Sequence, residues 1–200
     1  MKRLILALCF VLGVASPAAA EVDFIFNIKP LSVLLSSDID GFRVSRSGSY
    51  SYQSETVSGS ASVIPSFNLG LGVGPKKFKV DFTLGSGLLH NGAFDGTFVQ
   101  GDIGAHFMMG PITLGPHLGL INFSELEWSS SSSGLTFDTS KGSKAGLDFT
   151  VGKKISFNLT IDYISVDEAM VKTLDSGWSV NQSSIDFSGF AIFMGVFGRF

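Results

Sequence analysis

Eight segments of this chain alternate apolar and polar side chains with a period of two, and this pattern constrains the fold more than any other feature of the sequence. Successive side chains of a β-strand point to opposite faces, so the alternation predicts strands and argues against helices over these segments. The predicted strands are 22–35, 62–73, 78–90, 97–109, 112–128, 144–151, 155–165 and 183–200.

The connections between these strands alternate between long and tight. The tight ones, at 74–77, 110–111 and 152–154, all contain glycine, and two of them carry paired lysines. Short turns at one end and long loops at the other are typical of an up-and-down transmembrane barrel. The sequence therefore predicts an all-β fold, an eight-stranded antiparallel up-and-down transmembrane β-barrel. An even number of strands places both ends of the barrel domain on the same side.

The two faces of the strands differ in a way that favours a membrane. The apolar face is almost free of charge, whereas the polar face mixes glycine with Asp, Asn, Thr, Lys and His. An eight-stranded barrel is just wide enough for such side chains to fill its interior. About 9–11 tilted residues cross a bilayer, where every backbone polar group must be paired inside a closed sheet. We therefore expect the apolar face to point outward. Pro30 is expected to mark either a bulge or the upper end of its strand. Pro65 and Pro116 each remove a ladder donor in mid-strand, so we expect local bulges at these two positions.

The first twenty residues have the features of a signal peptide. Lys2 and Arg3 precede an apolar run, and three alanines end at Ala20. We predict a cleaved signal peptide at 1–20 and a barrel domain at 21–200. Cleavage removes the single cysteine, Cys9, and two of the 14 Lys and Arg residues, which leaves a net charge of 12 − 17 = −5. Such a chain has no disulfide or cysteine-based metal site, and it is not a nucleic-acid binder.

The last segment ends on an aromatic residue, Phe200, with Gly195 five positions before it. This arrangement resembles the terminal strand of bacterial outer-membrane barrels, in particular the small OmpA/OmpX/OmpW-like family. Gly198 and Phe193 depart from the family pattern, which has a large apolar and a polar residue at these places. The resemblance implies that Gly195 and Phe200 form a signal read by the barrel-assembly machinery. It also implies an outer-membrane location with both termini periplasmic, in contact with outer-membrane lipid and lipopolysaccharide.

The polar face predicts a network inside the lumen, because buried charges need partners. Asp81 and His106 are expected at similar heights on neighbouring strands, which could also be read as an acid–base pair. A metal site has even less support than an acid–base pair, because the sequence has three histidines and no two of them are closely spaced. We predict no catalytic, cofactor-binding or metal-binding residues and no cofactor. The predicted polar network consists of Lys29, Asn68, Asp81, Asp102, His106, His117, Asp148 and Asp162.

Other side chains suggest features at the loop end of the barrel. Trp128, Tyr163 and Trp178 are expected to form an aromatic girdle at the external membrane interface. The serine-rich tracts 45–60 and 129–134 are read as mobile, solvated loops, or as adhesive ones. Several apolar residues with lumen parity could form a pocket for a hydrophobic small molecule, or could be ordinary lumen packing: Leu35, Leu89, Ile121, Phe123, Phe187, Phe193 and Phe197.

Three functions are compatible with these features. The first is a non-enzymatic surface protein that displays loops and serves envelope integrity or surface interaction. The second is a narrow conduit or binding site for hydrophobic or small solutes. The third is a lipid-modifying enzyme, for which His90, Ser86 and Asp95 are the nearest candidates, although their spacing matches no known motif.

Overall fold

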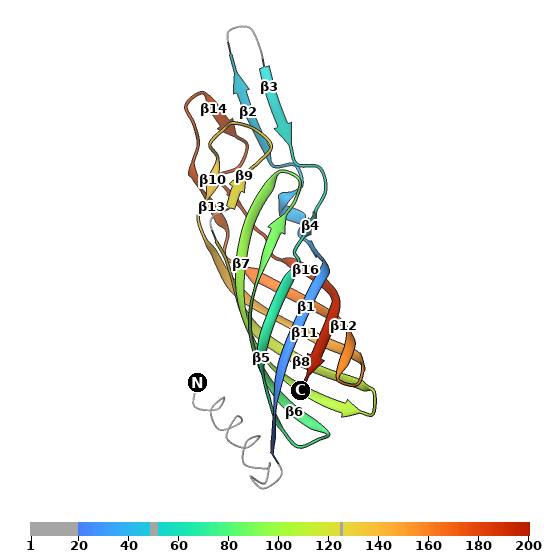
Figure 1. Cartoon of the computed structure of the whole chain (residues 1–200). Helices are drawn as coiled ribbons and strands as arrows, with labels where there is room; N and C mark the ends of the chain where they lie inside the picture. The colour runs from blue at the N-terminus through green and yellow to red at the C-terminus, as the bar shows by residue number, and fades with distance from the viewer. Residues whose placement is uncertain (1–19, 49–51, 125) are drawn as a thin grey trace.

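Eight long strands form a closed ring in the computed structural model, which describes residues 20–48, 52–124 and 126–200 (Figure 1). The predicted signal peptide lies outside the described residues, except for Ala20. Each strand pairs antiparallel with the next along the ring, and the last pairs with the first. In ring order the strands are β1 (Glu21–Leu35), β5 (Ser66–Gly74), β6 (Phe78–His90), β7 (Phe94–Met109), β8 (Ile112–Phe123), β11 (Ser140–Gly152), β12 (Ile155–Val166) and β16 (Gly189–Arg199).

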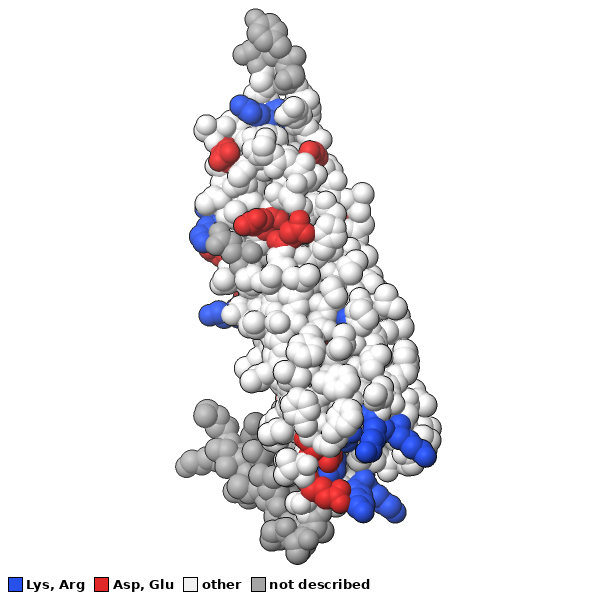
Figure 2. Space-filling model, viewed as in Figure 1, with Lys and Arg blue, Asp and Glu red and all other residues white. Residues whose placement is uncertain are grey.

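The predicted fold is confirmed by this ring and by its outer wall. Outward apolar side chains are exposed on every one of the eight strands; Leu84 is 74% exposed and Leu120 is 71% exposed. In Figure 2 a broad band without charged residues crosses the barrel, with charged residues below and above it. Exposure of such a large apolar surface to water is unfavourable, whereas contact with lipid hydrocarbon is not. This surface is therefore the wall of a transmembrane barrel. No helix among the described residues is long and apolar enough to cross a membrane.

One end of the barrel, here called the turn end, carries the three tight turns and the C-terminus (Figure 1). Gly110 has φ = 67° in the turn between β7 and β8, a conformation that favours glycine. Phe24 and Phe200 exchange backbone hydrogen bonds of 2.8 and 3.0 Å at this end. Pairing of the chain end with the first strand completes the ring.

The prolines act differently from one another. The register of β1 against β16 shifts between Ile28 and Leu31, so Pro30 marks a bulge and not the upper end of its strand. Pro65 lies in a break between β4 (Ala61–Val63) and β5. At Pro116 no bulge forms, which corrects the prediction: β8 pairs with β11 in one register throughout. The ladder from β8 to β7 instead skips two positions around Pro116, because proline has no N–H to donate.

The opposite end of the barrel, here called the cap, contains short strands and a short 3-10 helix within the long connections. The cap consists of η2 (Ser37–Ile39), β2 (Arg43–Ser47), β3 (Tyr52–Thr56), β4, β9 (Leu126–Trp128), β10 (Thr136–Phe137), β13 (Ala169–Thr173), β14 (Trp178–Val180) and β15 (Ser184–Ile185). Strands β14, β2 and β3 form one small sheet, and β9, β10, β13 and β15 extend the barrel wall upward.

An aromatic core holds the cap together. Phe42 is fully buried and its ring lies 5.8 Å from Phe94, 5.7 Å from Trp128 and 5.6 Å from Phe137. Phe187 reaches the same core, 6.0 Å from Phe94. These rings come from four separate parts of the chain, and aromatic pairs of this geometry each stabilise beyond the area they bury.

Of the two serine-rich tracts, 45–60 contains parts of strands β2 and β3 in its described residues, so it is not an irregular loop there. The tract 129–134 forms no strand and most of its residues are exposed, as predicted for a solvated loop. The mobility of both tracts remains a prediction.

Candidate functional site

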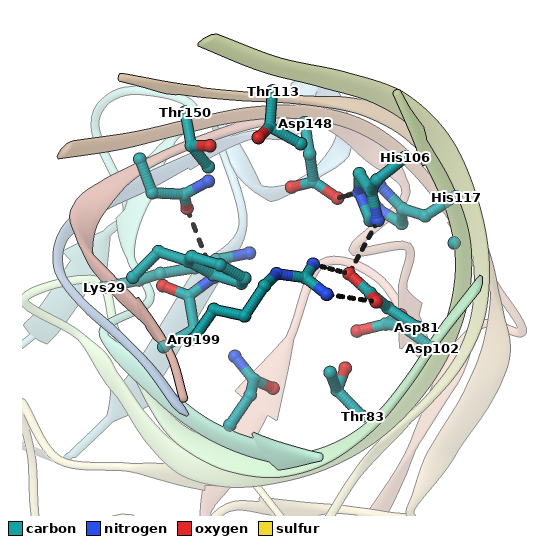
Figure 3. Close-up of a pocket in the computed structure, with 15 residues that line it drawn as sticks. Lys29, Asp81, Thr83, Asp102, His106, Thr113, His117, Asp148, Thr150 and Arg199 are labelled. Carbon is teal, nitrogen blue, oxygen red and sulfur yellow. Dashed lines mark hydrogen bonds and ion pairs between the residues drawn. The ribbon is translucent and has the colours of Figure 1, made fainter. Parts of the chain in front are cut away.

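The lumen is filled, and its contents change along the barrel axis. Polar and charged side chains occupy the half at the turn end, and the apolar cap core occupies the other half. The cavity that remains among the polar side chains measures about 40 Å³, enough for a few water molecules (Figure 3). All eight residues of the predicted network lie in this lumen, and all but Asp162 line the cavity: Lys29, Asn68, Asp81, Asp102, His106, His117 and Asp148.

A cluster of two cations and two carboxylates closes the turn end of the lumen. Arg199 donates to both carboxylate oxygens of Asp81, at 3.1 and 2.5 Å, in a bidentate pair. The same guanidinium lies 3.3 Å from Asp23, which also accepts from Lys79 at 3.1 Å. Only 2% of the Lys79 side chain is exposed. Planar, bidentate pairing of this kind is strong and fixes the position of both groups.

Two histidines connect this cluster to the middle of the lumen. His106 has Nδ1 2.8 Å from Asp81 and Nε2 3.2 Å from Asp148. His117 has Nδ1 3.0 Å from Asp148 and Nε2 3.0 Å from Asp162. Both nitrogens of each ring therefore lie within ion-pair distance of a carboxylate, and the contact between His106 Nε2 and Asp148 also has hydrogen-bond geometry. The result is an unbroken row of alternating carboxylates and imidazoles.

A third group of contacts reaches towards the cap. Lys144 is fully buried and lies 3.4 Å from Asp162 and 3.1 Å from Asp102. It also donates to Gln100 at 2.8 Å, and Gln100 donates to Asn68 at 2.7 Å. Each carboxylate of the predicted network therefore faces a cation or an imidazole. Within the described ranges, no group of three or more His, Cys, Asp or Glu side chains is arranged to hold a metal ion.

Lys29 lies where the polar and apolar halves meet. Its ammonium is 4.9 Å from the ring centroid of Phe193, and Lys144 is 5.7 Å from the same ring. In the part of the chain that the structure describes, no carboxylate lies within 4.0 Å of the Lys29 ammonium. Phe193 thus separates the charged network from the cap core while contacting two cations through its ring face.

The alternation pattern also contained residues that the prediction did not use. Lys144 is the first residue of the predicted strand 144–151 and shares the parity of Gly146 and Asp148, but it was not assigned to the lumen. Asp23, Lys79 and Arg199 have the lumen parity of their strands but were not placed in the predicted network, whose turn end they close. The pairing of carboxylates with cations depends on the stagger between neighbouring strands. The alternation pattern gives the face on which a side chain lies, but it does not give this stagger.

The apolar residues with lumen parity do not form an open pocket. Leu89, Ile121, Phe123, Phe187 and Phe193 are at most 2% exposed and pack within the cap core, which is the ordinary lumen packing of the two alternatives. Leu35 is 46% exposed on the outer wall, because the bulge in β1 shifts the parity of the residues that follow it. Phe197 lines the polar cavity and lies 5.4 Å from the Arg199 guanidinium.

Two of the three predicted girdle residues do not lie on the membrane-facing wall. Trp128 is 5% exposed inside the cap core, where its Nε1 donates to Glu55 at 3.3 Å. Trp178 belongs to the small cap sheet, with Arg46 5.7 Å from its ring. Both residues belong to segments that fold over the end of the barrel. Their position in the sequence therefore did not predict their position along the barrel axis. Tyr163 is 50% exposed on the outer wall and packs against Phe190; its role at the interface remains a prediction.

The candidate enzymatic residues do not form a nucleophile system. His90 Nδ1 lies 2.6 Å from Asp95, at the cap end of the β6–β7 hairpin. Hydrogen bonds from His90 and Ser129 to Asp95 hold the pKa of this carboxyl below its ordinary value. Ser86 lies four residues from His90 on the same strand, about 13 Å away at the usual rise of a strand. Ser129 contacts Asp95 and not His90, so the imidazole of His90 does not activate the Ser129 hydroxyl as the histidine of a catalytic triad does.

The predicted assembly residues lie next to the closure of the barrel. Gly195 faces the bulge of β1, where a Cβ atom would overlap the carbonyl oxygen of Ile28. Phe200 is 57% exposed and stacks on Phe26 at 5.9 Å. The ring of Phe26 also covers Gly198, which gives a structural reason for a glycine at that position. Recognition of this end by assembly machinery remains a prediction.

Comparison with known proteins gives no match to a protein-family model or to a curated protein. Among solved structures the chain is similar to Neisserial surface protein A, with 12% identity over 91% of this chain and 99% of that chain and a TM-score of 0.40. It is also similar to Ail, the attachment invasion locus protein of Yersinia pestis, solved with the heparin analogue sucrose octasulfate; identity is 16%, coverage 91% and 99%, and the TM-score 0.38. By its own strand order, closure and apolar wall, the chain has the fold of an eight-stranded antiparallel transmembrane β-barrel.

Proposed function

We propose that this protein is a non-enzymatic outer-membrane protein in which a closed barrel anchors a folded, acidic cap at the cell surface. The filled lumen is the observation that carries the proposal. A cavity of about 40 Å³ and a buried aromatic core leave no path for a solute along the axis. The conduit function therefore has less support, and the barrel is best understood as an anchor.

The cap is the part of the molecule that differs most from a plain barrel. Its charge is strongly negative: in the cap elements and the connections between them, three Lys and Arg residues oppose nine described Asp and Glu residues, a balance of 3 − 9 = −6. These acidic residues are Asp38, Asp40, Glu55, Glu127, Asp138, Asp167, Glu168, Asp175 and Asp186. Surface potential of one sign attracts partners of the other sign, so surface interaction through this cap favours a cationic partner over a sulfated polysaccharide.

The orientation that we propose places the cap outside the cell and the turn end in the periplasm. Short periplasmic turns and longer external segments are the rule in such barrels. The lipid contacts are then lipopolysaccharide around the cap side of the wall and phospholipid around the turn end. Assembly into this position uses the barrel-assembly machinery, for which Gly195 and Phe200 are the proposed recognition residues.

We expect the purified protein to insert into planar bilayers without producing conductance steps. The reason is the continuous packing of the lumen from the Arg199 cluster to the Phe42 core. Single-channel recording over a range of voltages measures this directly, with a known porin as the positive control. Reproducible steps in the wild-type protein would contradict the anchor function and favour the conduit.

An epitope inserted between Ser131 and Ser132 is expected to bind antibody on intact cells. The same epitope between Lys153 and Lys154 is expected to bind only after the outer membrane is permeabilised, since these two sites lie at opposite ends of the barrel. Flow cytometry of both strains before and after permeabilisation gives the measurement. Labelling of the second site on intact cells, with the first protected, would reverse the proposed orientation.

A further inference from the structure

A groove runs over the outer wall of the barrel close to the turn end. Its volume is about 550 Å³, within the range of about 300–1,000 Å³ that is common for ligand sites. The groove crosses the end of β7, the start of β8 and the middle of β11. Its walls are outward-facing apolar side chains, and one of the residues lining it is a lysine: Lys77, Phe107, Met109, Leu114, Pro116 and Leu147.

The apolar part of this groove lies in register across three strands. Phe107 is paired with Leu114 between β7 and β8, and Pro116 is paired with Leu147 between β8 and β11. Phe107 is 54% exposed and Leu147 is 56% exposed, so these side chains face the surroundings and not the lumen. A surface of this kind on the barrel wall is suited to an extended hydrocarbon chain.

Lys77 is held beside the end of this apolar track. The N–H of Met108 donates to the carbonyl oxygen of Lys77 at 2.9 Å, which ties the turn to the end of β7. Lys76, the neighbouring residue, lies 3.9 Å from Glu21. For Lys77, no carboxylate of the described residues lies within ion-pair distance. The ammonium of Lys77 is therefore available to an anion.

The charge of the turn end reinforces this arrangement. Lys76, Lys77, Lys153 and Lys154 are exposed there, and Glu21 is the acidic residue among them. Figure 2 shows Lys and Arg side chains gathered at this end, directly below the uncharged band. A cation at the boundary of an apolar wall matches the position of a lipid phosphate, because the headgroup sits where the hydrocarbon ends.

We propose that this groove is a binding site for an anionic phospholipid, with an acyl chain along Phe107, Leu114, Pro116 and Leu147 and the headgroup phosphate on Lys77. The site goes beyond the anchor function, since it assigns a specific lipid to one face of the barrel. It does not depend on orientation in the cell. A lysine beside the headgroup of an anionic lipid strengthens binding by about fivefold, and Lys77 is the lysine that lines this groove.

The test uses the folded protein reconstituted in vesicles of phosphatidylglycerol and phosphatidylcholine in equal amounts. After mild detergent extraction, native mass spectrometry counts the lipids that remain bound. We expect phosphatidylglycerol to be retained over phosphatidylcholine, and Lys77→Glu to lower that retention at least fivefold. The matched control is Lys154→Glu, which changes the same charge at the same rim outside the groove and is expected to have little effect.

A second variant separates the groove from the charge. Leu147→Trp fills the apolar track and leaves every lysine in place, so it is expected to reduce phosphatidylglycerol retention as well. Folding of each variant is checked by the shift of the unheated band in a denaturing gel. Equal losses in Lys77→Glu and Lys154→Glu, an unchanged Lys77→Glu variant, or equal retention of both lipids would each overturn the site. None of these outcomes bears on conductance or on epitope accessibility, so the anchor function is tested separately.

Discussion

Replacing Gly195 with valine is expected to lower the yield of folded barrel at least tenfold. Gly195 lies on β16 opposite the bulge that Pro30 introduces into β1. A Cβ atom at this position would overlap the carbonyl oxygen of Ile28 and approach the Cα of Lys29 to 2.8 Å. These are backbone atoms of the closing strand pair, so they cannot rotate away as a side chain could. Overpacking of this kind costs about 1–3 kcal/mol or more, and here it falls on the pairing of β1 with β16 that closes the ring.

The matched control for this prediction is Gly101→Val. Gly101 is also a strand glycine of the same barrel, but the nearest atom to its Cβ is a flexible methyl of Leu84 at 3.0 Å. The fraction of protein that resists unfolding in unheated gels, after refolding into lipid vesicles, measures both variants. If Gly195→Val and Gly101→Val folded equally well, the close approach at the β1 bulge would not govern closure. The assembly role proposed for Gly195 in cells is a separate question from this physical one.

Replacing Asp162 with alanine is expected to destabilise the barrel by about 3–5 kcal/mol. Asp162 is fully buried, 3.0 Å from Nε2 of His117 and 3.4 Å from the ammonium of Lys144, which is itself fully buried. Removing one partner of a buried ion pair leaves the other charge without compensation, and this is more costly than the pair is favourable. The variant leaves Lys144 with Asp102 as its remaining carboxylate and leaves one nitrogen of His117 without an acceptor.

Urea unfolding of the protein in vesicles, followed by circular dichroism, gives the change in the free energy of unfolding. Lys76→Ala is the control, because the Lys76 side chain is 84% exposed and its pair with Glu21 spans 3.9 Å. An exposed pair of this kind contributes about 0–1 kcal/mol. A loss below about 1 kcal/mol in Asp162→Ala would mean that water in the lumen replaces the missing carboxylate, and the network would then be less important for stability than proposed.

The eight strands could be predicted from the sequence, but some of their ends could not: the segments predicted at 112–128 and 183–200 correspond to β8 (Ile112–Phe123) and β16 (Gly189–Arg199). The segment predicted at 78–90 is strand β6, and the segment predicted at 155–165 ends one residue short of β12. The direction of each face was also predicted, since the apolar side of 155–165 points outward. Both results rest on local chemistry: the period of two, the glycine turns and the absence of charge on one face are properties of neighbouring residues.

The cap could not be predicted in the same way. Phe42, Phe94, Trp128, Phe137 and Phe187 are far apart in the sequence. Local alternation placed Trp128 and Phe187 in predicted strands, but it does not report which segments meet, because the partners of these rings come from other connections. The same reason explains why Trp128 was assigned to the interface when it belongs to the core. Leu35 was misplaced by a one-residue bulge, which reverses the parity of every residue after it.

By itself, then, the sequence determined the number of strands, their up-and-down order and which face meets hydrocarbon, since each of these follows from residues next to one another. Tertiary structure alone decided which lumen carboxylate pairs with which cation, because strand stagger sets their heights. It also decided that the long connections close over the barrel, because the aromatic core that stabilises them exists only when distant segments meet.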